Sequence, residues 1–146
     1  MIKVTIQIKS TSKHPLPKYQ TKEAAGLDLQ ANLDDDIVIQ PLERRVVPTG
    51  LFVSIPQGYE LQVRARSGLS LKHGITLANG VGTIDSDYRG EIGVILVNLS
   101  NEPYTIHDGD RIAQMILSKI EQAEIQPVVE LDSTERGEGG FGHSGF

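Results

Sequence analysis

The chain has 146 residues, a length that suits one domain with its own hydrophobic core. Its formal net charge is −5 at pH 7, which argues against a nucleic-acid polymer as partner, because binding one requires many cationic groups to neutralise phosphates. The absence of cysteine excludes disulfides, thiolate metal sites and a cysteine nucleophile.

The first residues of the chain predict a strand. Ile2, Val4, Ile6 and Ile8 alternate with polar residues, which is the period-two pattern of a half-buried strand. This start contains no apolar segment of the kind that a signal peptide or a membrane span requires. We therefore expect a cytoplasmic protein without a membrane segment.

Further strands are predicted along the chain, separated by turn-forming Gly, Pro and Asn. Apolar and polar residues alternate over residues 59–65, and short β-branched segments occupy 37–39, 51–55 and 92–97. Many short strands with regular breaks favour an all-β sandwich or barrel. One short helix is predicted over residues 67–73, with Ser67 as its capping residue and Gly74 as its stop. The sequence shows no internal repeat and no second domain.

The segment from Ile112 to Ala123 is ambiguous. Its apolar residues fit one face of a helix as well as a strand. A strand is preferred, because a Gly109–Asp110 turn precedes the segment and β-branched residues recur within it.

The last fifteen residues, 132–146, differ in kind from the rest. They contain five glycines and no aliphatic side chain, so they cannot bury enough surface to hold one position. We predict a β domain over 1–131 and a flexible Gly-rich tail over 132–146. The tail contains a GxGxxG pattern at Gly137, Gly139 and Gly142, but no strand precedes it and no helix follows, so it is no dinucleotide fingerprint. It is either an unstructured end or a segment that wraps a phosphate.

Two stretches could bind an anion or a cation, and each has an ordinary structural explanation as well. "RARSGLSLKHGI" places Arg64 and Arg66 before a helix start, where backbone N–H groups can face an anion; it is otherwise a capped turn. "AAGLDLQA" presents Asp28 on the face opposite Leu27 and Leu29; Asp28 is otherwise a plain surface aspartate.

The stretch "GTIDSDYRG" gathers charge at the end of a predicted strand. Asp85, Asp87, Tyr88 and Arg89 fall within five residues. They form either a solvated hairpin turn or a site for a charged substrate, and the stretch alone leaves both open.

The five segments AAGLDL, RSGLSLKHG, NGVGTIDSDYRGEI, GDRIAQMIL and RGEGGFGHSG resemble, in order, the five motifs of the homotrimeric dUTPase family. The resemblance spans residues 24–145. It implies a jelly-roll-like β-sandwich (a β-clip) in a threefold trimer whose sites draw residues from more than one subunit. It also implies hydrolysis of dUTP to dUMP and pyrophosphate with Mg²⁺, which limits uracil incorporation into DNA and supplies dUMP for thymidylate synthesis.

The resemblance implies a role for each matching residue. Asp85 activates the attacking water, Tyr88 lies against the deoxyribose, and Asp28 holds the metal through water. The uracil is read by Asn79 and by the backbone of Gly82, Thr83 and Ile84. The phosphates are held by Arg66, Ser67, Gly68 and Gln114, and in the tail by Arg136 and Ser144, while Phe141 covers the uracil and Gly142 makes a backbone contact.

The sequence departs from the family pattern at a few positions. It also leaves two alternative functions open. Ala65 and Val81 stand where proline is common, and His143 precedes Ser144 where Ser–Thr is common. A dCTP deaminase of the same fold needs a catalytic Glu inside the strand after the hairpin, and "EIGVILVN" has none in its interior. The other rival is a dUTPase-like trimer that serves as a regulatory binding protein. No role is assigned to Asp87 or Arg89.

Overall fold

The structure, a computed structural model, describes residues 1–145. The last residue of the predicted tail, Phe146, lies outside the described residues. The described part contains these strands and one helix: β1 (Gln7–Ser10), β2 (Leu27–Gln30), β3 (Ile37–Ile39), β4 (Arg44–Ser54), β5 (Tyr59–Arg64), α1 (Ser67–His73), β6 (Ile75–Leu77), β7 (Gly82–Ile84), β8 (Glu91–Asn98), β9 (Tyr104–Ile106) and β10 (Arg111–Lys119). The predicted all-β class with one short helix is confirmed.

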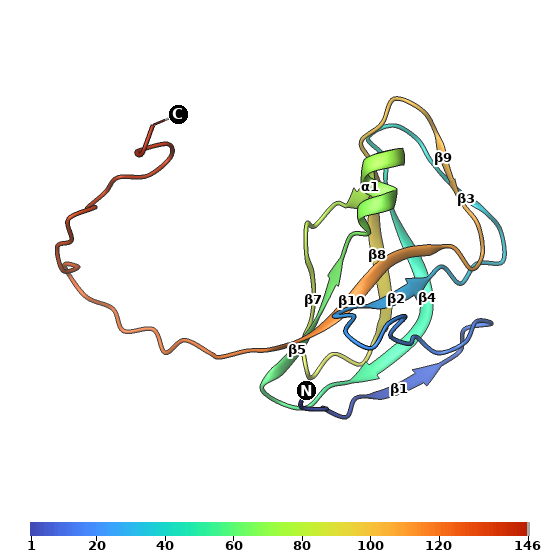
Figure 1. The fold of residues 1–146 in the computed structure, drawn as a ribbon, viewed down its shortest axis with the longest axis horizontal. Coiled ribbons are helices and arrows are strands. Elements are labelled where there is room, and N and C mark those ends of the chain that lie inside the picture. The colour runs from blue at the N-terminus through green and yellow to red at the C-terminus, as the bar shows by residue number, and fades with distance from the viewer. Residues whose placement is uncertain (146) are drawn as a thin grey trace.

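Two four-stranded sheets build the body of the molecule (Figure 1). One has the strand order β1-β4-β8-β6 and the other the order β2-β10-β5-β7, and every strand pair in them is antiparallel. A separate two-stranded ribbon joins β3 and β9. One continuous core of buried side chains contains residues of both sheets, which is the arrangement of a jelly-roll-like β-sandwich.

Alternation along the strands decides which side chains enter this core. In β5, Leu61 and Val63 are buried while Arg64 is exposed. In β8, the buried residues Ile92, Val94 and Leu96 alternate with less buried ones. Successive side chains of a strand point to opposite faces, so the period-two pattern over residues 59–65 predicted the buried positions of β5. The segment 92–97 shows no such alternation of apolar and polar residues, and the structure alone shows which of its side chains are buried.

The first predicted strand is wrong in its N-terminal half. Strand β1 begins at Gln7 and pairs with the end of β4, from Gln7 opposite Ser54 to Ser10 opposite Leu51. Ile2 precedes the paired segment and its side chain is 94% exposed. Alternation reports the character of the side chains, whereas a strand also needs a neighbouring backbone to pair with.

Helix α1 covers the predicted range but is capped differently. Its N-cap residue is Arg66, and no side chain caps it. Ser67 is therefore the first helical residue and not the cap, which leaves first-turn N–H groups without a side-chain acceptor. At the other end Gly74 adopts a left-handed conformation with φ 67° and donates its N–H to Ser70 O at 3.0 Å, as glycine commonly does after a helix.

The ambiguous segment after Gly109 is a strand, β10, as preferred, although it ends at Lys119 and not at Ala123. A β-bulge between Arg111 and Ala113 shifts its register against β2. Because a bulge turns one extra residue toward the same face, the consecutive residues Ile112 and Ala113 are both buried. The bulge thus explains why the alternation was hard to recognise here.

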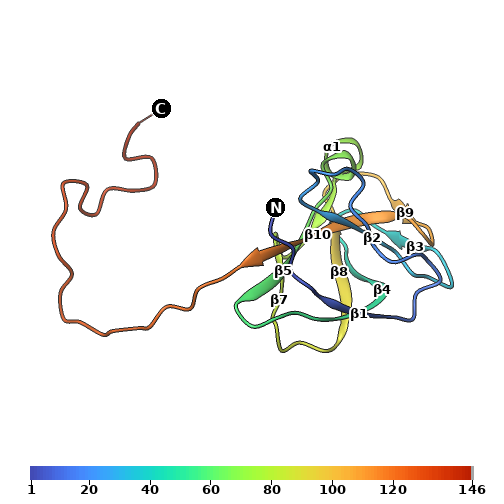
Figure 2. The same ribbon diagram turned by 60° about the horizontal axis from the view of Figure 1, so that its bottom comes forward.

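Beyond β10 the chain leaves the body as a long extended arm (Figures 1 and 2). Its apolar side chains are exposed, with Ile125 at 83%, Val129 at 101% and Leu131 at 86%. The proposed boundary between residues 131 and 132 stays a prediction. No helix in residues 1–145 is long and apolar enough to cross a membrane.

Candidate active site

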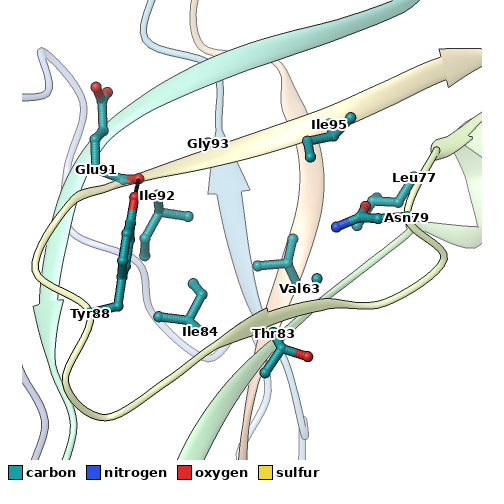
Figure 3. Close-up of a pocket in the computed structure, with 11 residues that line it drawn as sticks. Val63, Leu77, Asn79, Thr83, Ile84, Tyr88, Glu91, Ile92, Gly93 and Ile95 are labelled. Atoms are coloured by element: carbon teal, nitrogen blue, oxygen red, sulfur yellow. Dashed lines mark hydrogen bonds between the residues drawn. The ribbon is translucent and has the colours of Figure 1, made fainter.

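A cavity of about 170 Å³ opens between β7 and β8 (Figure 3). It brings together five residues that the sequence placed in one motif: Asn79, Gly82, Thr83, Ile84 and Tyr88. The other walls, which the sequence did not assign, are Val63 of β5, Leu77 of β6, and Glu91, Ile92, Gly93 and Ile95 of β8. Leu77 and the β8 residues are close to this motif in the sequence, whereas Val63 reaches the cavity through the pairing of β5 with β7.

Gly82 allows the close packing at the Asn79 end of this cavity. A Cβ atom on Gly82 would lie 3.1 Å from Val63 Cβ and 3.3 Å from Asn79 Nδ2. The side chain of Asn79 points into the cavity, whereas that of Thr83 points away from it (Figure 3). The Asn79 carboxamide and the nearby backbone groups are therefore the polar groups at this end of the cavity.

Tyr88 stands at the opposite end of the cavity from Asn79 (Figure 3). Its hydroxyl donates a hydrogen bond to the backbone carbonyl of Glu91 at 2.9 Å. The residue is 45% exposed, so one face of its ring is available to a ligand.

Asp85 directly follows β7 and is exposed on the turn that leads to Tyr88. It lines a second hollow, of about 720 Å³, together with Gln57, Arg89 and Gln122. Arg89 Nη1 donates to the carbonyl oxygens of Ser86 at 2.7 Å and Tyr88 at 3.0 Å. Arg89, which had no assigned role, thus braces the turn that carries both Asp85 and Tyr88.

Asp28 of β2 lies between two arginines in a separate cluster. Its carboxylate is 3.4 Å from Arg66 Nε and 3.5 Å from Arg111 Nη1, and its side chain is 20% exposed. Arg66 also donates to Arg111 O at 3.0 Å. Two guanidinium groups beside one carboxylate leave an excess positive charge, which favours an anionic ligand.

Arg111 belongs to this cluster and was missed by the sequence prediction. It stands in the segment GDRIAQ, of which only Gln114 was assigned a role. The pairing of β2 with β10 brings Arg111 beside Asp28, and this pairing joins residues that are far apart in the sequence.

Gln114 completes the cluster from β10. It lies directly opposite Asp28 on one neighbouring strand and opposite Arg64 on the other. Its Nε2 donates to Ala65 O at 3.1 Å. A Cβ atom on Gly26 would overlap Gln114 Oε1, so the small residue at position 26 makes room for this amide. Ser67 and Gly68 follow Arg66 directly, at the start of α1.

The tail residues gather around a hollow of their own. Arg136, Phe141, Gly142 and Ser144 line a space of about 340 Å³ within the tail. Arg136 Nε donates to Gly139 O at 2.8 Å, and Phe141 is fully exposed. The tail arcs away from the body (Figures 1 and 2), so it meets neither the cavity nor the Asp28 cluster of its own chain.

No group of three or more His, Asp or Glu side chains in residues 1–145 could hold a metal ion by itself. Asp28 offers one carboxylate beside a positively charged surface. Mg²⁺ dehydrates reluctantly and is commonly bound by one or two carboxylates plus substrate phosphates. The residues present therefore fit a magnesium ion that is held through water and brought by a phosphate ligand.

Asp85 and the Asp28 cluster lie beyond opposite ends of the part of β5 that pairs with β7. Strand β7 pairs with β5 so that Ile84 is opposite Leu61 and Gly82 is opposite Val63. Asp85 thus lies beyond the Leu61 end, while Arg66 follows the other end of β5. The five steps along the chain from Leu61 to Arg66 span about 16 Å of extended chain at ~3.3 Å per residue. Figure 1 shows the same separation, with α1 at the top of the body and the β7–β8 turn at the bottom.

Comparisons with known proteins agree on one family. The dUTPase family model matches residues 12–145. A deoxyuridine 5'-triphosphate nucleotidohydrolase of Finegoldia magna is 60% identical over 97% of this chain and 99% of its own length. The solved structure of a Staphylococcus bacteriophage 80alpha dUTPase with dUPNHPP has a TM-score of 0.86 at 32% identity, covering 97% of this chain and 99% of that one. A mutant dUTPase from S. aureus phage phi11, described with a structural Mg(II) ion, has a TM-score of 0.79 at 27% identity, covering 88% and 99%.

Proposed function

The chain belongs to the dUTPase family, and we propose that its cavity and its Asp28 cluster are the two halves of a site that is completed only between copies of the chain. As a member of the family it is a dUTP diphosphatase, which hydrolyses dUTP to dUMP. Pyrophosphate is the other product. We propose that this reaction limits uracil incorporation into DNA and supplies dUMP for thymidylate synthesis, in the cytoplasm, where nucleotide pools are found.

The direction of the cavity is the observation that carries this proposal. Asn79 stands at one end of the cavity and Tyr88 at the other, and Asp85 lies in the turn beyond. A nucleotide with its uracil at Asn79 and its deoxyribose at Tyr88 directs its phosphates past Asp85. Those phosphates then point away from the Asp28 cluster of the same chain, so a second copy must supply that cluster.

The base and the sugar are recognised by different means. The Asn79 carboxamide and the backbone of Gly82, Thr83 and Ile84 offer donors and acceptors to the uracil edge. Gly82 and Val63 are in close contact there, which leaves little room for a methyl group such as that of thymine. The ring of Tyr88 lies against the deoxyribose and excludes a 2′-hydroxyl.

Asp85 activates the hydrolytic water. Its carboxylate accepts a proton as the water oxygen attacks the α-phosphorus, and the bond from the α-phosphorus to the bridging oxygen breaks to release pyrophosphate. Arg66, Gln114 and the backbone N–H groups of Ser67 and Gly68 hold the phosphate oxygens of the substrate. Asp28 would hold a Mg²⁺ ion through water, and the ion would neutralise charge on the phosphates of the triphosphate.

We propose that the copies associate as a homotrimer. The arm after β10 exposes Ile125, Val128, Val129 and Leu131, and exposed apolar groups of this extent mark a surface that another protein covers. Its tail, residues 132–146, then reaches the site of a neighbouring copy. There Arg136 and Ser144 hold the γ-phosphate, Phe141 covers the uracil, and Gly142 contacts the ligand through its backbone.

A deaminase function receives no support from β8. The interior of this strand, from Ile92 to Val97, contains no acidic residue. Glu91 at its start is already engaged, because its Oε1 accepts the backbone N–H of Gly50 at 2.8 Å. Nothing in residues 1–145 specifically favours the rival function of a regulatory binding protein.

Product analysis distinguishes these functions. The protein is incubated with dUTP, dCTP or UTP and Mg²⁺, and bases and phosphates are identified by chromatography. We expect dUMP and pyrophosphate from dUTP, with little product from the other two. A deaminated product from dCTP would indicate the rival enzyme, and no turnover of any nucleotide would indicate the binding protein.

A further inference from the structure

Two contacts within its own turn fix the position of the Tyr88 ring. The hydroxyl is bound to the carbonyl of Glu91 at 2.9 Å (Figure 3). The ring lies against the bare Cα of Gly90: a Cβ atom there would overlap Tyr88 Oη and would lie 2.5 Å from Cζ and 2.9 Å from Cε2. Cβ atoms essentially never approach other heavy atoms to under 3.0 Å, so the observed ring position requires glycine at position 90.

The backbone of Gly90 does not itself require glycine. Gly90 is absent from the residues with positive φ among those that the structure describes, whereas Gly80, before the same hairpin, has φ 72°. A left-handed backbone favours glycine and other φ values do not. The missing side chain at position 90 therefore serves the ring of Tyr88 and not the geometry of the turn.

A side chain at position 90 would displace the Tyr88 ring more readily than it would displace the backbone of the turn. The turn is braced by the two hydrogen bonds from Arg89 to the carbonyls of Ser86 and Tyr88. It is also closed by the bond from the Tyr88 N–H to Asp85 O at 3.1 Å. The ring has only its hydroxyl bond to Glu91 and one exposed face, so it yields first.

We propose that Gly90 is a positioning residue that determines sugar specificity. Its bare Cα lets the Tyr88 ring fold back to reach the carbonyl of Glu91, which makes the ring a fixed wall at the sugar end of the cavity. Detached from that carbonyl, the ring swings toward solvent and no longer excludes a ribose. This inference rests on the proposed placement of the sugar against Tyr88.

The test compares kcat/KM for UTP and dUTP in the wild type, Gly90→Ala, Tyr88→Ala and the double variant. We expect Gly90→Ala to raise the UTP-to-dUTP ratio by about tenfold or more, the low end of what one methylene-sized change in a pocket produces. We expect Tyr88→Ala to raise the ratio as well. In the double variant, Gly90→Ala adds nothing further, because it acts through a ring that is gone.

The variants of this experiment distinguish a failure of the proposed sugar placement from a failure of the inference about Gly90. If Tyr88→Ala leaves the ratio unchanged, the sugar placement and the inference both fail. If Tyr88→Ala raises the ratio and Gly90→Ala leaves it within twofold, only the inference fails. Ser86→Ala, which adds no atom near the ring, is the matched control in the same turn and leaves the ratio unchanged.

The double variant also keeps the test informative if Gly90→Ala alone does not fold. Thermal unfolding is measured for all variants. A folded double variant beside an unfolded single one supports the collision between the new Cβ and the ring. Two unfolded variants would contradict it, because glycine would then be needed for the turn itself.

Discussion

Asp85 is the residue on which the proposed chemistry depends most. It is exposed on the braced turn after β7, where a bound water and the α-phosphorus are proposed to meet. Asp85→Asn keeps the size of the side chain and removes the base, so we expect turnover to fall by roughly 10²–10⁴-fold while dUTP still binds. Steady-state kinetics and binding of a non-hydrolysable analogue measure the two effects. Turnover within a few-fold of the wild type would remove Asp85 from the mechanism.

Asp108 holds the loop before β10 to the N-terminal segment. Its Oδ1 accepts the backbone N–H of Leu33 at 2.8 Å and lies 2.8 Å from His14 Nε2. The hydrogen bond from Leu33, followed by that with His14, lowers the pKa of the Asp108 carboxyl from 3.8 to about 2. A lowered pKa stabilises the fold above the unfolded pKa and loses that contribution as the pH falls through the folded one.

We therefore expect Asp108 to stabilise the protein fully above about pH 4 and progressively less down to about pH 2. Urea unfolding at several pH values compares the wild type with Asp108→Asn. The difference in unfolding free energy between them is expected to be larger at pH 6 than at pH 2. A difference that is constant over this range would contradict the pH linkage. Asp35→Asn, on an exposed aspartate of a nearby loop, is the control.

At the scale of single elements, the sequence pattern predicts a helix or strand correctly where that element depends on residues close to one another in the sequence. The alternation over residues 59–65 matched β5, and the Ser67–His73 helix matched α1, because both depend on side chains close in sequence. The segment 2–6 alternates equally well but has no strand to pair with. The bulge in β10 likewise depends on its partner β2.

The residues of the candidate site divide in the same way, into those close together in the sequence and those brought together by contacts between distant strands. The motif around Asp85 supplied five residues of the cavity because they are consecutive or nearly so. Arg111 and Glu91 escaped prediction because Arg111 contacts Asp28 and Glu91 contacts Gly50, which lie on strands distant in the sequence. The motif order came from resemblance to a family, and periodicity alone indicated only the β class.

The tail is the element whose role is most open to test. Residues 132–145 are exposed or half-exposed and lie away from the body, and ordering them costs about 1–2 kcal/mol each. We expect deletion after Thr134 to leave a folded protein with a severely reduced kcat, because the triphosphate is no longer held in its reactive geometry. Phe141→Ala is expected to be milder than Arg136→Ala, since a charge-assisted contact to phosphate is stronger than stacking.

Two measurements check the tail. Limited proteolysis with and without a non-hydrolysable dUTP analogue and Mg²⁺ reports whether the tail becomes protected, and kinetics of the truncated protein report its role. Protection only with the analogue is the expected result. A truncated enzyme with near-normal turnover would leave the tail without a catalytic task.

At the scale of the whole molecule, the fold of one chain separates the groups that the proposed reaction brings together. Asp85 and Arg66 lie beyond opposite ends of β5 in one chain. The antiparallel register of β5 with β7 fixes this separation within one chain. In the proposed trimer a head-to-tail interface closes it, because such an interface joins two different surfaces of neighbouring copies.

Subunit complementation tests this central claim most directly. Asp85→Asn and Arg66→Ala, each inactive alone, are unfolded together at equal amounts and refolded so that their subunits mix. Random assortment in a cyclic trimer places an intact Asp85 beside an intact Arg66 of a neighbour in about a quarter of the sites, so we expect about a quarter of the wild-type activity to return. Either variant mixed with the Asp85→Asn/Arg66→Ala double variant gives none and serves as control. If the mixture of single variants stays inactive although mixed trimers form, each site lies within one chain and the account is wrong.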